Sequence, residues 1–263
     1  MVTSFYTPLQ MREIFHLEFL RWFGRKTRAD RYSLKGGVNL RLFYGSIRYS
    51  EDMDIDVQRL SVVDVREITM GILGAGAFAV SLEPFGVKAV VPPDMAKAKQ
   101  TDTTQRFKIH LLTGAGDDLF TKIEFSRREA HGAVVASPVP SSVTRAYKIM
   151  PVIVPHYDAV SAFCQKVGAL AGRSVTQARD IFDLYLLSSL VGAMDVAPAA
   201  LSAPVLAKAC ENVFAVEYDE FQGAVVTYLS EDDRQVYERR AIWDELKLKV
   251  SDLLEAIRKR YDS

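Results

Sequence analysis

Three aspartates alternate with apolar residues in the N-terminal half of the chain: Asp52, Asp54 and Asp56. If they lie on a strand, all three side chains leave by the same face, because side chains alternate along a strand. Carboxylates on one face repel each other unless a cation neutralises them. Oxygen ligands at this spacing suit Mg²⁺, which also binds substrate phosphates. The pattern therefore indicates metal-dependent phosphoryl or nucleotidyl transfer.

Two adjacent glycines, Gly36 and Gly37, precede the aspartates. Glycines let the backbone approach a ligand closely, and a helix that begins just after them directs its positive end at a phosphate. Apolar residues at 40, 43 and 44 have the spacing of one helix face. Gly45 then turns the chain and leaves the Ser46 hydroxyl for a phosphate oxygen. Alone, the glycines favour a turn, and the aspartates are equally consistent with a solvated acidic segment and a functional site. Their combination favours a phosphate and metal site.

The pattern K-G-G-x-x-L-x-L-x-Y-G-S-x-R-x-S-x-D-x-D runs from Lys35 to Asp54. It resembles the signature of the AbiEii/AbiGii nucleotidyltransferase toxins, the toxin halves of bacterial abortive-infection, type IV toxin–antitoxin systems. Their superfamily includes DNA polymerase beta. The resemblance implies that Asp52 and Asp54 hold Mg²⁺ and act in catalysis. It implies nucleotide binding by further residues of this stretch: Lys35, Gly36, Gly37, Ser46, Arg48 and Ser50. Val38 departs from the family, which often has a small hydroxyl residue there, so a side-chain phosphate contact is not expected at that position.

A further carboxylate, Glu124, lies on the second of two strands predicted at residues 106–112 and 120–126, which a Gly-rich turn joins as antiparallel neighbours. In the resembled superfamily a third carboxylate from a neighbouring strand completes the metal site, and Glu124 matches it in Lys-Ile-Glu-Phe-Ser. The alternative is a surface strand that carries Lys122 and Glu124 on its polar face.

A second group of charged residues follows in the C-terminal half: Lys166, Arg173 and the R-D-x-x-D element that holds Asp180 and Asp183. The two aspartates are neighbours on a helix surface, and Arg179 can pair with Asp183 four residues on. By resemblance, Lys166 and Arg173 bind the nucleotide phosphates, and an aspartate of R-D-x-x-D is needed for activity. Asp180 or Asp183 could orient the cations or act as a general base. The alternative is an ordinary ion-pair network within the helix.

Hydrophobic periodicity predicts a mixed α/β (α+β) architecture, with the sheet in residues 1–140 and a helical region at 141–263. The resemblance implies that the first is a nucleotidyltransferase-like domain and that the second is a helical domain that completes the active-site cleft. The boundary is expected in a loop at 138–142. His16 is expected at the boundary of the apolar face of the first helix. Helices are predicted at residues 8–23, 62–73, 157–171, 175–190, 197–212, 218–229 and 241–261. Strands are predicted at residues 52–57, 87–91, 106–112, 120–126 and 152–154, and a short strand or a turn at 32–35. The resemblance covers residues 30–190, and nothing is recognised beyond Val191.

Composition is that of an ordinary globular chain, with 33 basic and 33 acidic residues and therefore no overall cationic field. Cys164 and Cys210 have apolar neighbours and are expected to be reduced core residues of a cytoplasmic protein, with a disulfide as the alternative. No signal peptide and no membrane span are expected. The C-terminal residues 239–260 are locally basic and could follow an RNA backbone or form a solvated helix face.

The resemblance implies transfer of a nucleotide from a nucleoside triphosphate to an RNA acceptor, with the tRNA 3′ end as the suspected site and growth arrest as the outcome. It implies an antitoxin encoded alongside, usually a DNA-binding repressor. Two other classes remain open. The acceptor could be a Ser, Thr or Tyr hydroxyl of another protein. Alternatively, the chain could be a non-catalytic nucleotide-binding module, although such a module has no need of paired metal ligands.

Overall fold

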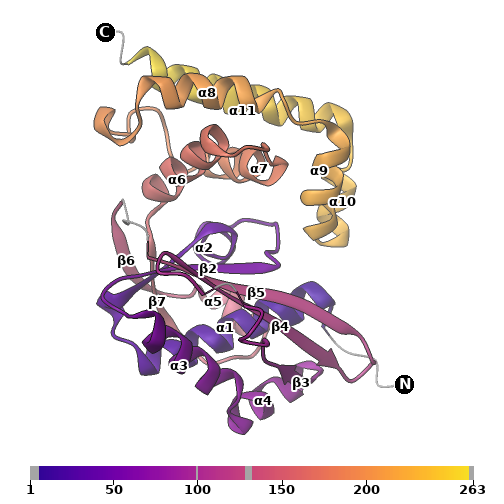
Figure 1. Cartoon of the computed structure of the whole chain (residues 1–263). Coiled ribbons are helices and arrows are strands. Elements are labelled where there is room, and N and C mark those ends of the chain that lie inside the picture. The colour runs from indigo at the N-terminus through magenta and orange to yellow at the C-terminus, as the bar shows by residue number, and fades with distance from the viewer. Residues whose placement is uncertain (1–5, 99, 128–131, 261–263) are drawn as a thin grey trace. The chain divides into compact units, whose positions relative to one another are not determined.

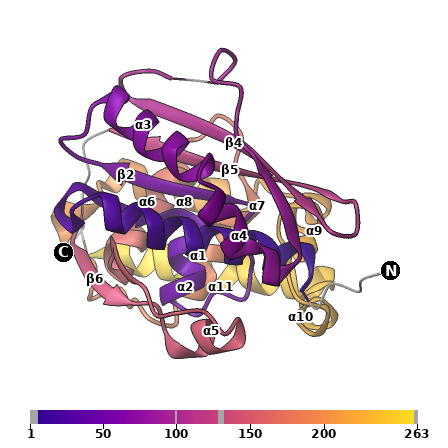
Figure 2. The ribbon, with the colours of Figure 1, turned by 90° about the horizontal axis from the view of Figure 1, so that it is seen from below.

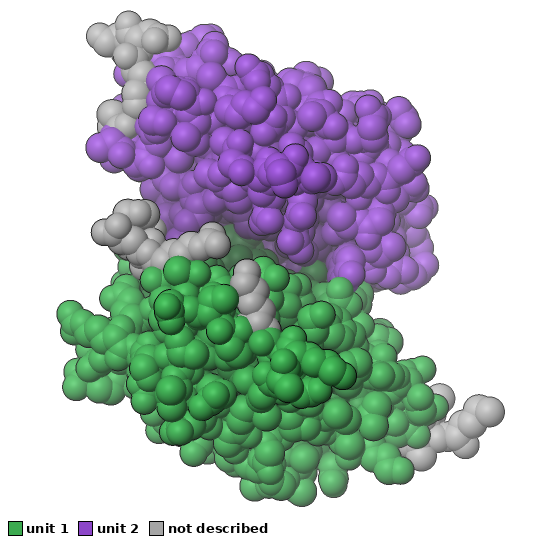
Figure 3. Space-filling model, viewed as in Figure 1, with its two compact units in different colours: residues 1–43, 49–157 green, residues 44–48, 158–263 purple. Residues whose placement is uncertain are grey.

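The computed structural model describes residues 6–98, 100–127 and 132–260 (Figure 1). The chain divides into two compact units (Figure 3): residues 1–43 with 49–157, and residues 44–48 with 158–263. Apart from the segment 44–48, the two units therefore meet in the chain at residues 157–158, whereas the boundary predicted from the sequence is at 140–141. The reason is that residues 134–157 add two strands to the sheet of the first unit. The short segment 44–48 of the signature stretch clusters with the second unit.

The first unit is built on one mixed sheet of seven described strands in the order β3-β4-β5-β2-β1-β7-β6. Their bounds are β1 Tyr32–Lys35, β2 Asp52–Val57, β3 Val87–Val91, β4 Thr104–Thr113, β5 Asp118–Ser126, β6 Val134–Pro138 and β7 Ile153–Tyr157. The central strand β2 pairs antiparallel with β1 and parallel with β5. The predicted mixed sheet is therefore confirmed, as is the antiparallel pairing of β4 with β5.

The helices of this unit are α1 Pro8–Lys26, α2 Gly36–Phe43, α3 Val62–Leu73, α4 Gly76–Leu82 and α5 Ser141–Ala146. Figures 1 and 2 show α1, α3 and α4 on the same face of the sheet. Met53, Ile55 and Val57 of β2 are buried in the core. Since side chains alternate along a strand, the three aspartates of β2 leave by the opposite face.

Local sequence signals explain where the first helices begin. Thr7 caps α1 in a capping box with Gln10, and Ser61 caps α3 in the same way with Asp64, as the N-cap rules lead one to expect. His16, expected at the edge of the apolar face of α1, is instead 1% exposed and hydrogen-bonded to Thr121 at 2.9 Å. Burial and the nearby Arg12 lower the pKa of His16 to about 3, so the imidazole is neutral.

The expectation of a loop at residues 138–142 is wrong. Strand β6 ends at Pro138 and helix α5 begins at Ser141, so only two residues separate them. The strand was missed because its residues are mostly exposed and do not alternate in hydrophobicity, the signal on which a sequence-based assignment depends. Its pairing with β7 settles its conformation.

The second unit is helical, as predicted. Its helices are α6 Ala159–Gly172, α7 Ala178–Leu187, α8 Ala203–Val213, α9 Tyr218–Ala224, α10 Glu231–Tyr237 and α11 Arg240–Lys259. The rings of Phe221 and Trp243 stack at 4.4 Å in its core, beside Phe182 of α7. Helix α7 is shorter than the predicted 175–190, and α10 was not predicted. Cys164 and Cys210 are free thiols, and burial raises the pKa of each to about 11.

No single helix within the described ranges is long and apolar enough to cross a membrane. Helix α3 and the following segment Gly76–Phe85 are together long and apolar enough for a span, but the pair is bent by 57°. Apolar side chains of this pair, such as Ile72 and Phe78, are buried in the core of the first unit.

Candidate active site

Strand register brings the predicted carboxylates of the first unit to one face. Asp54 lies opposite Glu124 on the parallel strand β5, and Asp52 lies opposite Lys122. Lys35 at the end of β1 lies opposite Asp54 on the other side. Residues opposite each other on paired strands share a face, so Glu124 and Lys122 lie on the same face as Asp52 and Asp54.

The Asp54 carboxyl is the electrostatic centre of this face. Burial raises its pKa, and the carboxylates of Glu124 and Asp52 act in the same direction, while Lys35 and Lys122 oppose them. A carboxyl in this setting resists ionisation until another cation arrives. A divalent cation is the group that would satisfy it.

Cationic side chains partner the other carboxylates of the face. Lys122 contacts Asp52 at 2.8 Å, and Arg106 contacts Glu124 at 2.6 Å. Lys35, predicted to bind nucleotide, forms an ion pair of 2.5 Å with Asp56. Among the described residues no group of three His, Cys, Asp or Glu side chains is arranged to hold a metal ion. Two aspartates still fit Mg²⁺, which commonly takes one or two carboxylates and fills its other positions with substrate phosphates and water.

Gly36 explains why a glycine stands at the start of α2. Its φ is +69°, in the left-handed region, and a Cβ there would lie 2.7 Å from Oδ2 of Asp54. The sequence predicted a helix that begins just after the two glycines, but helix α2 begins at Gly36 itself. The close approach of backbone to carboxylate is therefore built into the site.

Gly36→Ala is expected to lower the free energy of unfolding by about 1–2 kcal/mol through its left-handed backbone and, in addition, to displace the Asp54 carboxylate and reduce transfer activity. Gly116→Ala is the matched control, since φ is +95° at Gly116 but no atom lies within 4 Å of an added Cβ. Chemical denaturation and a transfer assay on both variants test this. Equal activity in the two variants would show that the Asp54 contact does not matter.

The signature loop after α2 is held by its own hydrogen bonds. In the second unit, the Ser46 hydroxyl accepts from the Arg48 backbone N–H at 3.3 Å, and the Arg48 guanidinium makes a two-pronged contact with Asp183 at 3.1 and 3.0 Å. In the first unit, the Ser50 hydroxyl donates to the Asp52 carbonyl at 2.8 Å. Ser46 and Arg48, predicted as nucleotide contacts, are thus engaged in ordering the loop.

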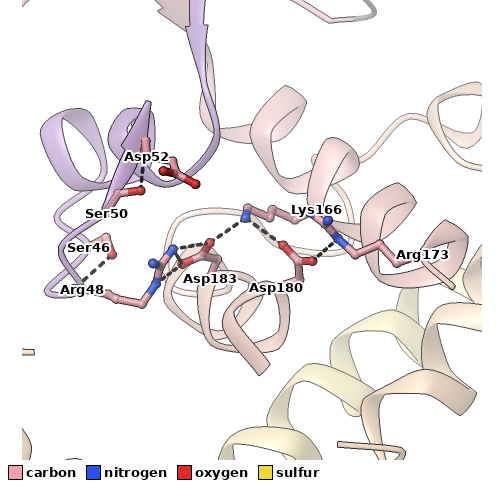
Figure 4. Close-up of polar contacts among 8 residues, drawn as sticks. All are labelled: Ser46, Arg48, Ser50, Asp52, Lys166, Arg173, Asp180 and Asp183. Carbon is pink, nitrogen blue, oxygen red and sulfur yellow. Dashed lines mark hydrogen bonds and ion pairs between the residues drawn. The ribbon is translucent and has the colours of Figure 1, made fainter. Parts of the chain in front are cut away.

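The second predicted group forms one continuous ion-pair network in the second unit, which Figure 4 shows from Arg48 to Arg173. Lys166 Nζ lies 2.9 Å from Asp180 and 2.6 Å from Asp183. Arg173 contacts the other oxygen of Asp180 at 2.8 Å. The expected pairing of Arg179 with Asp183 is wrong, because Arg48 and Lys166 are the ion-pair partners that Asp183 has.

The electrostatics of this network keep its groups charged. Burial alone would lower the pKa of Lys166, but Asp183 and Asp180 outweigh it and the pKa is raised. Burial would raise the pKa of Asp180, but Lys166 and Arg173 outweigh it and the pKa is lowered. A carboxylate bound by two cations is a weak base. The arrangement therefore favours an orienting role for Asp180 over a general-base role.

Three basic residues of α11 form ion pairs along their own helix. Lys247, Lys249 and Arg258 pair with acidic residues three or four positions before them. Of the two interpretations of this segment, the solvated helix face is therefore favoured over an RNA-binding surface.

Sequence reasoning missed partners that have no local signal. Tyr157 donates to Asp56 at 2.7 Å from a strand more than a hundred residues away, and Arg106 comes from β4. Lys122 could have been found, because it precedes Glu124 by two residues on the same face, but its pairing with Asp52 depends on the register of β5 against β2.

Solved structures of other proteins have a similar fold. The structure is similar to that of JHP933 from Helicobacter pylori (18% identity, TM-score 0.57, 98% of this chain and 95% of that one). It is also similar to the nucleotidyltransferase toxin MenT4 from Mycobacterium tuberculosis (16% identity, TM-score 0.57, 95% and 94%). These similarities are of fold. No curated protein matches the sequence.

The family model for the nucleotidyl transferase AbiEii toxin of type IV toxin–antitoxin systems matches residues 18–262. This match extends well beyond the 30–190 that the motifs cover, so the helical region after Val191, where nothing was recognised, is part of the family too. The chain belongs to the AbiEii nucleotidyltransferase toxin family.

Proposed function

We propose that this nucleotidyltransferase moves a nucleotide from a nucleoside triphosphate to a hydroxyl of RNA, at the 3′ end of tRNA, and that Mg²⁺ is its cofactor. The observation that carries the metal proposal is the setting of Asp54, whose pKa is raised by burial and by Glu124 and Asp52. Like charges gathered on one face are stabilised by a divalent cation, and carboxylate oxygens are the ligands that Mg²⁺ prefers.

In this proposal Asp52 and Asp54 hold the metal, and Glu124 joins them when it leaves Arg106. A bound metal would activate the acceptor hydroxyl and neutralise charge on the transferring phosphate. The Gly36 and Gly37 backbone borders the site and allows the close approach to Asp54 that a side chain would block.

The charged network of the second unit supplies the cations for the triphosphate. Asp180 and Asp183 keep Lys166 protonated and fix its position. Arg173 is 38% exposed and retains donors beyond its contact with Asp180, so it has donors available for a phosphate. Asp180 and Asp183 act as positioning residues for these cations.

The tRNA acceptor rests on the resemblance of the signature stretch, and the experiment that tests it is direct. The purified protein is incubated with Mg²⁺, each labelled nucleoside triphosphate in turn, and total tRNA. We expect label in tRNA with one base favoured, and none with Asp52→Ala or with chelator. Label on protein instead would establish the protein-modifying alternative.

The family also implies a partner, since type IV toxins act with an antitoxin. We propose that this antitoxin is encoded beside the toxin and that both act in the cytoplasm. Expression in a host distinguishes catalysis from sequestration by a nucleotide-binding module. Asp52→Ala should abolish growth arrest if transfer causes it, whereas a module that sequesters a partner would stay toxic.

A further inference from the structure

Helix α1 carries a buried ion pair that the proposed reaction does not use. Glu13, 4% exposed, contacts Arg41 of α2 through both oxygens, at 2.8 and 3.3 Å. The Tyr147 hydroxyl donates to the same carboxylate at 2.5 Å. A buried ion pair contributes little net stability compared with apolar side chains of the same volume, because both charges lose their hydration. The role of the pair is therefore indicated by the other residues that it holds in place.

The pair holds Tyr49, the residue that begins the approach to the carboxylate strand. The Arg41 guanidinium lies over the Tyr49 ring at 4.0 Å, and the Tyr147 hydroxyl is also hydrogen-bonded to the Tyr49 side chain. Tyr49 is 9% exposed. Both groups that bind Glu13 thus also contact Tyr49. The Arg41 guanidinium lies over its ring, and the Tyr147 hydroxyl is hydrogen-bonded to its side chain.

Two more contacts tie α1 to the same segment. Arg12 forms an ion pair with Glu51 at 3.3 Å. The Thr121 hydroxyl donates to the Glu51 carbonyl at 2.7 Å, and His16 lies 2.9 Å from that hydroxyl. Since the single Thr121 proton goes to Glu51, the neutral His16 must donate its Nε2 proton to Thr121. Residues 49–51, which carry Ser50 and lead into Asp52, are therefore anchored to α1 at several points.

We propose that Glu13 is a positioning residue for nucleotidyl transfer: through Arg41 and Tyr147 it fixes Tyr49, and with it the segment that places Ser50 and Asp52. This rests on the proposed role of Asp52 as a metal ligand. Hydrophobic periodicity predicts only a packing face for α1, whereas its polar residues at 12, 13 and 16 all contact residues 49–51 or the groups that hold them. A small displacement of a reacting group can lower a rate about 100-fold without changing substrate affinity.

Glu13→Gln tests this, because it keeps the volume of the side chain and removes the charge that holds Arg41. Glu18→Gln is the matched control: Glu18 lies on the same helix, its side chain is 4% exposed, and it pairs with Arg21 at 3.2 Å. We expect Glu13→Gln to lower kcat by about 10–100-fold with KM for the nucleotide within about threefold. Glu18→Gln should keep the wild-type kcat even if its melting temperature falls as much.

Wild-type kcat retained in Glu13→Gln, or an equal loss of kcat in Glu18→Gln, would overturn the proposal. If Glu13→Gln does not fold, Tyr147→Phe decides, because it removes only the hydroxyl shared by Glu13 and Tyr49. A several-fold lower kcat with KM unchanged is then expected, and an unchanged kcat would count against the role. If the wild-type protein itself fails to label RNA, the proposed function fails instead, and the two failures are distinct.

Discussion

Asp54→Asn is expected to abolish nucleotidyl transfer while making the metal-free protein more stable. The activity loss should be about 10³-fold or more if Asp54 holds the metal as proposed, since a metal ligand contributes several kcal/mol to the transition state and each 1.36 kcal/mol is a factor of ten. The stability gain follows from the raised pKa of Asp54, caused by burial and by Glu124 and Asp52. A carboxyl whose pKa is raised on folding lowers stability as the pH rises from its unfolded-state pKa to its folded-state pKa, and the full penalty applies above the folded-state value. Asparagine removes this penalty.

Transfer assays and melting temperatures at neutral pH, with and without Mg²⁺, measure both effects. Mg²⁺ should raise the melting temperature of the wild type by mass action and that of Asp54→Asn much less.

Asp56→Asn provides the control on the same strand. Asp56 is ion-paired with Lys35 and accepts a hydrogen bond from Tyr157, so its loss should lower the melting temperature. Two aspartates two residues apart are thus expected to change stability in opposite directions. If Asp54→Asn lowers stability as Asp56→Asn does, like-charge repulsion is not what dominates at Asp54.

The features that could be predicted from sequence are those whose causes are local. Strand β1, helix α3 and the alternation of the β2 aspartates depend on residues within a few positions of each other. The signature stretch is of this kind, because the glycines and carboxylates that a phosphate and a metal require are adjacent in the chain. The sequence could place Glu124 on a strand near the aspartates, but not directly opposite Asp54, because strand register depends on the whole sheet.

The partners of the charged residues could not be predicted, because they are chosen by tertiary structure. Helical spacing offered Arg179 to Asp183, but Arg48, 135 residues away, takes that place. An exposed intrahelical pair contributes only a few tenths of a kcal/mol, so it yields readily to a buried bidentate contact. The partners of Glu13, Arg41 and Tyr147, could not be predicted for the same reason, since helical periodicity shows only a polar residue beside an apolar face.

Asp183→Ala is expected to have the largest effect on stability of any single change in the network. It leaves Arg48 and Lys166, whose side chains are 6% and 12% exposed, facing an empty position. Removing one partner of a buried ion pair typically costs about 3–5 kcal/mol, because the remaining charge loses its compensation without regaining water. Denaturant unfolding measures this loss. Asp180→Ala should cost less, about 1–2 kcal/mol, because Lys166 keeps Asp183 and the partly exposed Arg173 can turn to solvent.

The double variant Arg48→Met, Asp183→Leu separates stability from function. Removing both charges should restore much of the lost stability, since buried ion pairs are often replaced by apolar residues at no net cost. Transfer activity should stay low, because Arg48 then no longer joins the Ser46 loop to α7 and Lys166 has lost one of its two anchors. Full recovery of transfer in the double variant would show that Arg48 and Asp183 serve only to balance each other's charge. Recovery of stability without transfer would identify the pair as the element that orders the signature loop.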